Sequence, residues 1–436
     1  MNLSTIVQYL RKTQQLPAGV WVLLGVFFSL ISSLYAPAII IASILYWLAS
    51  YQLRSKISTR NAIQSLVLVS IGVCLCIIAY GQDQRVSLLE ILEANVTIVS
   101  MLAGVSFLTM ISQPKIGQKE SLPIGNRTII STFLGVHLFG AVINMSSVFI
   151  HADRMSANRA LSPGQLMVLT RGFSCGAFWS PFFAAMAVAL SYVPSANLAL
   201  LMLIGGGISV LAMCFTFFEI KYRHSDTLFY GFPLRVNSLL LPSLLTALVF
   251  IIHYLFPDLS ILFIITLCSP LLCLVFLAFK ANPKELIQQH IEKRLSNMQN
   301  EIVLFLSAGV FGVGLNAILS NQSWFAPFNV FDASAASVCF MLMIGLSMLG
   351  FHMLIGISIV APMVLPLDPD PSLLAFIILA SWAIGAAVGP LSGMNISIQG
   401  TYGVSSHKIQ RWNFRYALVM TTVVIAVIFV LDKFLL

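Results

Sequence analysis

An apolar run at residues 373–384 leads directly into a stretch of glycine, proline and polar residues, and this junction narrowly limits how the chain can fold. The stretch covers residues 385–400 and reads Gly-Ala-Ala-Val-Gly-Pro-Leu-Ser-Gly-Met-Asn-Ile-Ser-Ile-Gln-Gly. Pro390 has no backbone N–H, so a membrane helix through it is weakened and its freed backbone groups need polar partners. A kink satisfied by neighbouring helices meets that need, and so does a broken helix that lines a polar cavity. The polar side chains at the break belong to Ser392, Asn395, Ser397 and Gln399.

A second stretch repeats this pattern earlier in the chain. Residues 176–181, Gly-Ala-Phe-Trp-Ser-Pro, match residues 385–390, Gly-Ala-Ala-Val-Gly-Pro. Two further pairs of segments match in the same order, and all three pairs are separated by roughly 210 residues. Three matches in order at nearly one offset indicate an internal duplication. The further pairs are residues 140–147 with 350–357, and residues 104–112 with 312–320.

The composition excludes a soluble protein. Of 436 residues, 58% are hydrophobic and 9% are charged, and the mean hydropathy is +0.94, which predicts an all-α polytopic membrane protein. The net charge of +8 comes from basic residues scattered in short loops, so we expect no nucleic-acid partner. The seven cysteines all fall in apolar runs, and the Cys-Leu-Cys at residues 74–76 has no His or carboxylate neighbours, which predicts membrane packing and no metal site. We expect no cleavable signal peptide at the N-terminus, because Arg11 and Lys12 precede an apolar run but no cleavage site followed by a soluble domain appears.

The positions of the basic loops predict a re-entrant hairpin at residues 128–150. If this segment crossed the membrane, the two basic loops that follow it would lie outside, against the positive-inside bias. If it turns back near residues 144–147, both loops are cytoplasmic. The basic residues of these loops are Arg154, Arg159, Arg171, Lys221, Arg223 and Arg235.

The same reasoning predicts a second hairpin of opposite orientation. It covers residues 335–366, turns near residues 351–358 and is followed by an acidic loop at residues 368–370 that suits the outside. The prediction is therefore two inverted repeats, each with a re-entrant hairpin and a broken transmembrane helix. The domain organisation is N-terminal spans at 1–85, a first repeat at 86–256, a connecting span and cytoplasmic linker helix at 257–301, and a second repeat at 302–436.

This repeat architecture resembles the ion transporter superfamily, which includes divalent anion/sodium symporters, citrate carriers and arsenite permeases. The resemblance covers roughly residue 104 onward and implies a homodimeric inner-membrane carrier that works by an elevator motion. It also implies that the hairpin tips and helix breaks bind sodium and a small anionic substrate. The Ser-Asn-Thr tip that is typical of the dicarboxylate carriers is absent, so the resemblance does not specify the substrate.

The candidate substrate- and ion-binding residues are the polar residues and glycines at the tips and breaks. Hydroxyl and carbonyl oxygens suit Na⁺, and half-helix N-termini favour an anion. Arg171 either pairs with a substrate anion or sets topology as a snorkelling residue. His137 and His352 either carry protons or are hydrogen-bonded packing residues. The candidates are Asn144, Ser146, Ser147, Ser174, Ser180, Ser358, Gly389, Ser392, Asn395 and Ser397.

Taken together, these features predict a secondary active transporter of a small organic or inorganic anion, coupled to Na⁺ or H⁺ by alternating access. The alternative is a lipid or polyprenyl-phosphate translocase that uses the same hairpins and anion-binding helix ends. An enzyme is not expected, because clustered His, Asp or Glu at membrane depth, an HExxH pair and a Gly-x-Ser-x-Gly elbow are all missing. We therefore name no catalytic residue, no metal ligand and no cofactor beyond the coupling ion.

Overall fold

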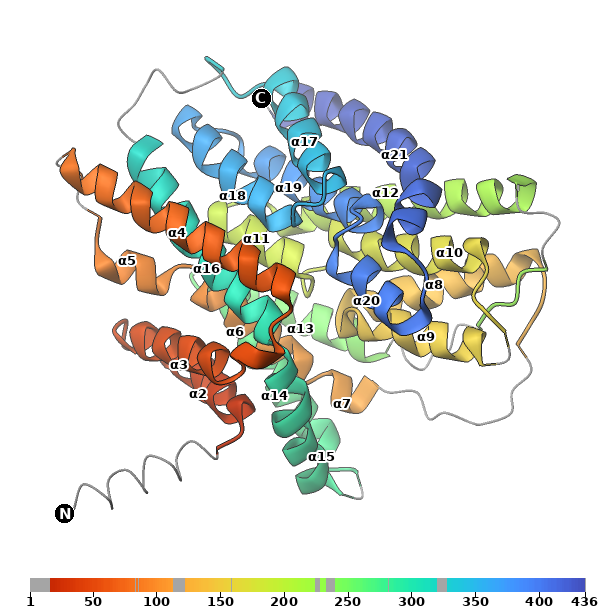
Figure 1. Cartoon of the computed structure of the whole chain (residues 1–436), viewed down its shortest axis with the longest axis horizontal. Coiled ribbons are helices and arrows are strands. Elements are labelled where there is room, and N and C mark those ends of the chain that lie inside the picture. Colours follow the sequence, from red (N-terminus) through yellow and green to blue (C-terminus); the bar gives the residue numbers. More distant parts are fainter. Residues whose placement is uncertain are drawn as a thin grey trace. The chain divides into compact units, whose positions relative to one another are not determined.

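The chain is an all-α polytopic membrane protein. A computed structural model describes residues 16–435 apart from 83, 85, 113–121, 158, 224–227, 233–239, 281 and 320–327, so Arg235 of the second basic loop lies outside the described residues. Within this described part, helices form the fold and β-structure is limited to an isolated bridge between Ile124 and Tyr230 (Figure 1). Six helical segments in the described part are long and apolar enough to cross a membrane. They are Thr59–Gly81, Leu88–Ile111, Leu198–Arg223, Gln299–Leu319, Pro371–Tyr402 and Ser406–Phe434.

The chain forms two compact units, residues 1–111 with 265–314 and residues 112–264 with 315–436. This division cuts across the predicted repeats, whose boundaries at 85, 256 and 301 stay a prediction from the sequence. Unit 1 contains α2 (Ala18–Ile31), α3 (Ala38–Gln52), α4 (Thr59–Gly81), α5 (Leu88–Glu93), α6 (Val96–Ser106), α15 (Pro283–Gln289) and most of α14 (Ile261–Leu277) and α16 (Gln299–Leu319). Unit 2 contains α8 (Asn126–Ile143), α9 (Ser146–Ser156), α10 (Pro163–Ser174), α11 (Ala184–Tyr192), α12 (Leu198–Arg223), α13 (Leu240–Leu255), α17 (Ala333–Met348), α18 (Met353–Val364), α19 (Pro371–Val388), α20 (Gly393–Tyr402) and α21 (Ser406–Leu435).

The first two helices of unit 1 are shorter than the spans expected from the sequence. The apolar runs at 17–35 and 36–52 predict two full spans, but α2 and α3 have 14 and 15 residues. A span needs about 20 residues, and the turn at Ser32 to Pro37 takes up the difference. The two helices pack on each other, and Tyr46 of α3 hydrogen-bonds to Ser100 of α6 at 2.7 Å.

The predicted linker helix at residues 280–301 is observed as a series of short helical turns. After α15 come a π-helical turn at His290–Arg294 and a 3₁₀ turn at Leu295–Asn297. Gly19 of α2 lies directly against this segment, because a Cβ at Gly19 would be 1.8 Å from the Ile291 carbonyl oxygen. His290 is buried, and the Oγ of Ser106 in α6 lies 3.1 Å from its Nε2. Ser106 donates to its own helix, so neutral His290 donates to Ser106.

This buried histidine predicts a loss of stability in acid. Burial, with a further contribution from the positive charge of Arg294, lowers the pKa of His290 to about 4. Between that value and the ordinary value of 6.5 the unfolded chain binds the extra proton, so stability is highest above pH 6.5 and falls as the pH approaches 4. We expect a loss on the order of 3 kcal/mol from this group, at about 1.4 kcal/mol per pKa unit.

The measurement is the thermal unfolding midpoint of the purified protein between pH 7.5 and pH 4.5. His290→Gln is the matched control, because glutamine keeps a side-chain donor for Ser106 and does not titrate. The pH dependence should be shallower in this variant than in the wild type. Identical profiles for the two proteins would contradict a role for His290.

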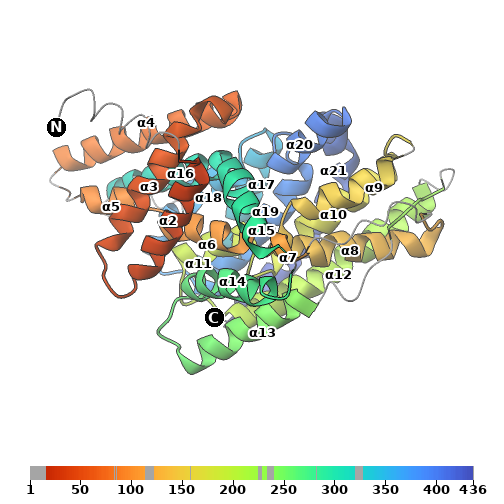
Figure 2. The same cartoon turned by 90° about the horizontal axis from the view of Figure 1, so that it is seen from below.

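Unit 2 contains a helical hairpin at the first predicted position. Helices α8 and α9 pack side by side and reverse at Asn144 and Met145 (Figures 1 and 2). Asn144 has φ +56° and ψ −146°, which lies outside the left-handed helical region that asparagine tolerates and in a part of conformational space that favours glycine. The open ends of the two arms meet at Phe232, whose N–H donates to Thr132 of α8 and whose ring lies under Arg154 of α9. The two arms therefore return to one end of the unit, and their re-entry into a membrane stays a prediction.

The second predicted hairpin is also present, but its tip lies earlier than expected. Helices α17 and α18 pack on each other and reverse at residues 349–352, where Gly350 has φ +100°. His352 begins α18 as its N-cap, because its Nδ1 accepts a hydrogen bond from the Leu354 N–H at 3.2 Å. Ser358, expected at the tip, is therefore inside α18, where it is buried next to the hydroxyl of Tyr192. The tip prediction was wrong for Ser358, because the glycine turn reverses the chain before that residue is reached.

The two broken helices of unit 2 both lie against helix α12, and they begin at opposite ends of it. Gly164, at the start of α10, lies 3.6 Å from the side chain of Ile220 at one end of α12, measured from an ideal Cβ. Ser372, at the start of α19, accepts a hydrogen bond from the Asn197 N–H at the other end. The broken helices that begin with α10 and α19 therefore start at opposite ends of α12. From Ser372 to Val388, α19 is buried throughout, so it forms the core of the unit.

Candidate functional site

The first break separates α10 from α11. Helix α10 begins with a capping box, in which Ser162 accepts from the Gln165 N–H and Gln165 accepts from the Ser162 N–H. The helix ends at Ser174, continues as a 3₁₀ turn at Cys175–Phe178, and α11 begins only at Ala184. In the gap, Ser180 accepts a hydrogen bond from the Phe182 N–H and donates one to the Ala141 carbonyl of α8. Ser180 thus joins the first break to the first hairpin.

The second break separates α19 from α20. Gly389 leaves the helical conformation, with ψ 117°, and Ser392 caps α20 by accepting from the Asn395 N–H at 3.3 Å. The Asn395 side chain points back into the break, and its Nδ2 donates to the carbonyls of Ala387 and Gly389 at 3.2 and 2.9 Å. Asn395 is fully buried, and its Oδ1 has no hydrogen-bond partner within the described part of the chain. A buried amide oxygen of this kind is an open acceptor for a cation or a donor group.

The two breaks meet at a side chain from a third helix. Asn413 of α21 is fully buried, and its Nδ2 donates to the Thr170 hydroxyl and to the Ala387 carbonyl, each at 3.0 Å. Thr170 lies one turn before the first break, and Ala387 lies just before the second. Asn413 therefore bridges the ends of the two half-helices that lead into the breaks.

Arg171 is neither a snorkelling residue nor a free partner for an anion. Its side chain has no exposed surface, and its Nη1 donates to Glu219 of α12 at 2.7 Å. Its Nε donates to the Asn413 Oδ1 at 2.8 Å, and its Nη2 donates to the Trp412 carbonyl at 3.1 Å. The guanidinium also lies over the ring of Tyr416, 4.9 Å from the ring centre. The positive charge of Arg171 is compensated inside the protein by Glu219. Arg171 is therefore a buried ion-pair residue, and neither of the two roles considered from the sequence describes it.

The predicted site residues fall into three groups. Ser174, Gly389, Ser392 and Asn395 lie at the two breaks, whereas Ser180 joins the first break to the first hairpin. At the first tip Ser147 is buried and donates to the Val136 carbonyl at 3.3 Å, and Asn144 and Ser146 are partly exposed. Ser358 and Ser397 lie within helices, and Ser397 is partly exposed on the outer face of α20.

The two hairpin histidines have different surroundings. In the first hairpin, the Trp179 indole N–H donates to the His137 Nε2 at 3.0 Å, so the Nδ1 carries the proton and donates to the Gly172 carbonyl, also at 3.0 Å. Both nitrogens of His137 are occupied, which favours packing over proton transfer. In the second hairpin, His352 caps α18 and its ring stands edge-on against Trp382.

Glu219 and Asn413 were not predicted from the sequence as functional residues. Glu219 follows the apolar run at 197–218 and looks like the start of a loop, but α12 continues through it to Arg223. Asn413 lies between Arg411 and Arg415 and looks like part of a basic loop, but α21 begins earlier, at Ser406. A signal was present in each case, because a lone carboxylate or amide on a helix that continues into an apolar run has to find a partner.

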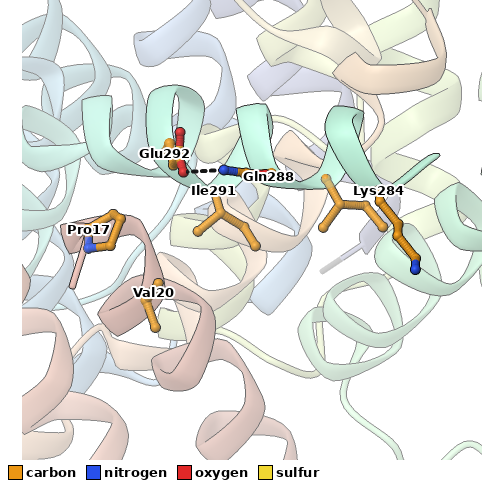
Figure 3. A pocket seen from close by; sticks show the side chains of 7 residues that line it. Pro17, Val20, Lys284, Gln288, Ile291 and Glu292 are labelled. Carbon is orange, nitrogen blue, oxygen red and sulfur yellow. Dashed lines mark hydrogen bonds between the residues drawn. The ribbon is translucent and has the colours of Figure 1, made fainter. Parts of the chain in front are cut away.

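A metal site and a surface groove were also considered as functional sites, and both have weaker support than the two breaks. No group of three or more His, Cys, Asp or Glu residues that could hold a metal occurs among the residues that the structure describes. In unit 1, a shallow groove with a volume of about 380 Å³ lies between the start of α2 and the segment that begins with α15 (Figure 3). The groove is mainly apolar, and the Gln288 side chain there is bonded to Glu292 at 2.8 Å. It contains no predicted site residue.

No protein-family model matches this chain, and a search of curated proteins finds no significant match. The geometry of the two breaks is therefore the main indication of function.

Proposed function

We propose that this protein is a secondary active transporter that moves a small organic or inorganic anion across the membrane by alternating access. The observation that carries this proposal is that two broken helices meet at the buried amide of Asn413, and that the buried Oδ1 of Asn395 in the second break has no hydrogen-bond partner in the described part of the chain. Broken helices that begin at opposite ends of a bundle and meet in its interior are the arrangement in which membrane transporters bind ions and substrates. We include in the same proposal that the protein consists of two inverted repeats, lies in the inner membrane and forms a homodimer.

The geometry favours a coupling cation at the second break. The Asn395 Nδ2 is used for the Ala387 and Gly389 carbonyls, which leaves the Oδ1 as a ligand for a hard cation such as Na⁺. The anion would bind at the N-terminal ends of the half-helices, where backbone N–H groups are available. Arg171 is not the anion's counter-charge in this proposal, because Glu219 already neutralises it. H⁺ is the alternative coupling ion, and His352 is then the histidine to substitute first.

The test is a thermal-shift screen of the purified protein against small carboxylates and oxyanions in sodium chloride and in choline chloride. A ligand that binds the folded state at 100 times its Kd adds about 2.7 kcal/mol of stability. We expect at least one anion to stabilise the protein more strongly in sodium than in choline. A hit that depends on pH but not on Na⁺ would instead indicate H⁺ coupling.

Two variants make the screen specific for the second break. Asn395→Ala should abolish the sodium-dependent shift, because it removes the open oxygen. Thr401→Ala, on the exposed side of the same helix, should keep the shift. If no anion stabilises the protein and anionic lipids do, the transporter proposal is wrong and the lipid or polyprenyl-phosphate translocase is favoured.

A further inference from the structure

We propose that Asn413 is a positioning residue that sets the geometry of the second break and thereby the affinity of the site for its coupling cation. This inference rests on the proposed function for the cation, but its structural part can be tested separately. Asn413 does not line the open side of Asn395; it acts through the Ala387 carbonyl, which both amides share.

The shared carbonyl needs side-chain donors because the helix ends there. In a continuous helix the Ala387 carbonyl would accept from the N–H four residues later, but the chain leaves the helix at Gly389. Asn395 and Asn413 replace that donor with their Nδ2 groups, at 3.2 and 3.0 Å. A buried carbonyl that loses a donor costs free energy, so the break keeps this shape only while the two amides are in place.

The Asn413 amide can face in one direction only. Its Oδ1 accepts from the Arg171 Nε, and a guanidinium nitrogen can only donate. The opposite side of the amide, which carries the Nδ2, must therefore face Thr170 and Ala387. Arg171 is itself fixed by hydrogen bonds to Glu219 and to the Trp412 carbonyl. The buried ion pair therefore determines the orientation of the Asn413 amide, which in turn donates to the Ala387 carbonyl at the break.

This chain of contacts determines where the Asn395 oxygen points. When Asn413 satisfies one side of the Ala387 carbonyl, the Asn395 Nδ2 can be shared between Ala387 and Gly389, which turns the Asn395 Oδ1 away from the backbone. Without the Asn413 donor, Asn395 has to compensate for Ala387, and its Oδ1 moves from that position. The cation site should then weaken although no residue that touches the cation has changed.

Asn413→Asp tests this inference with the smallest possible change. The aspartate keeps an oxygen for Arg171 but places a second oxygen, in place of the donor, against the Ala387 carbonyl. Thr216→Val is the matched control: Thr216 is equally buried, its hydroxyl donates to its own helix, and it contacts Arg171 only at 3.5 Å. Both proteins are compared with the wild type as full chains in detergent.

Two readouts are measured. Hydrogen–deuterium exchange of peptides that cover residues 385–396 should be at least about tenfold faster in Asn413→Asp, and the sodium concentration that gives half of the thermal shift should rise at least about tenfold. Thr216→Val should change neither value by more than about twofold. If Asn413→Asp does not fold, Asn413→Ser is used, because its hydroxyl is too short to reach Arg171 and Ala387 together.

The outcomes separate this inference from the proposed function. A lower melting temperature of Asn413→Asp with unchanged exchange at the break and unchanged sodium dependence would mean a merely structural role and would overturn the inference. If the wild type does not respond to Na⁺ at all, sodium coupling fails, and with it the part of this inference that concerns sodium affinity. The exchange measurement then decides the structural part: faster exchange confined to the break supports it, and unchanged exchange overturns it.

Discussion

Replacing Arg171 by glutamine should destabilise the protein by about 3–5 kcal/mol, because the change leaves the carboxylate of Glu219 buried without its partner. The side chains of Arg171 and Glu219 are 0% and 7% exposed and lie 2.7 Å apart, so water cannot take the place of the missing charge. Glu219→Gln should have a comparable cost for the same reason. The measurement is equilibrium or thermal unfolding of the purified variants.

A double replacement provides the control for this prediction. Arg171→Met combined with Glu219→Leu removes both charges, so it should recover a large part of the stability that each single change loses. The recovery should be incomplete, because methionine cannot donate to Asn413 or to the Trp412 carbonyl. A cost below about 1 kcal/mol for Arg171→Gln would be typical of an exposed ion pair and would contradict the burial described here.

Replacing Gly205 by valine should cost on the order of 3 kcal/mol or prevent folding, because it overpacks the contact between α12 and the first break. A Cβ at Gly205 would lie 2.1 Å from the Phe178 carbonyl oxygen, and that oxygen belongs to the backbone, which cannot rotate away. The same surface of α12 also holds the Cys175 carbonyl, through the Ser209 hydroxyl at 3.1 Å. The measurement is the yield of monodisperse protein and its melting temperature.

The neighbouring glycines are matched controls. A Cβ at Gly206 or Gly207 would meet no atom within 4 Å, so valine at either position should be tolerated. If Gly206→Val is as harmful as Gly205→Val, helix propensity rather than close packing explains the loss. If Gly205→Val and Gly206→Val both behave like the wild type, α12 does not pack closely on the first break.

The breaks and hairpins were predictable because local residues produce them. Pro181 and Pro390 lack the N–H that a continuous helix needs, and the two hairpins followed from the positions of the basic and acidic loops. The partners of Arg171 were not predictable, because Glu219 and Asn413 are 48 and 242 residues away and no local pattern brings them to it. The second tip was placed too late because a single glycine with positive φ, Gly350, decides where the chain reverses.

The position of Arg171 also has a consequence for how the chain enters the membrane during synthesis. At about 5–20 residues per second, Arg171 is made several seconds before Glu219 and roughly 10 to 50 seconds before Asn413. An arginine inside the membrane that has no partner is energetically costly. Helix α10 is therefore expected to enter the bilayer together with α12, as a pair that neutralises itself. The two breaks are joined only later, when α21 arrives, so a nascent chain that stops between α12 and α21 contains the buried ion pair but not the finished site.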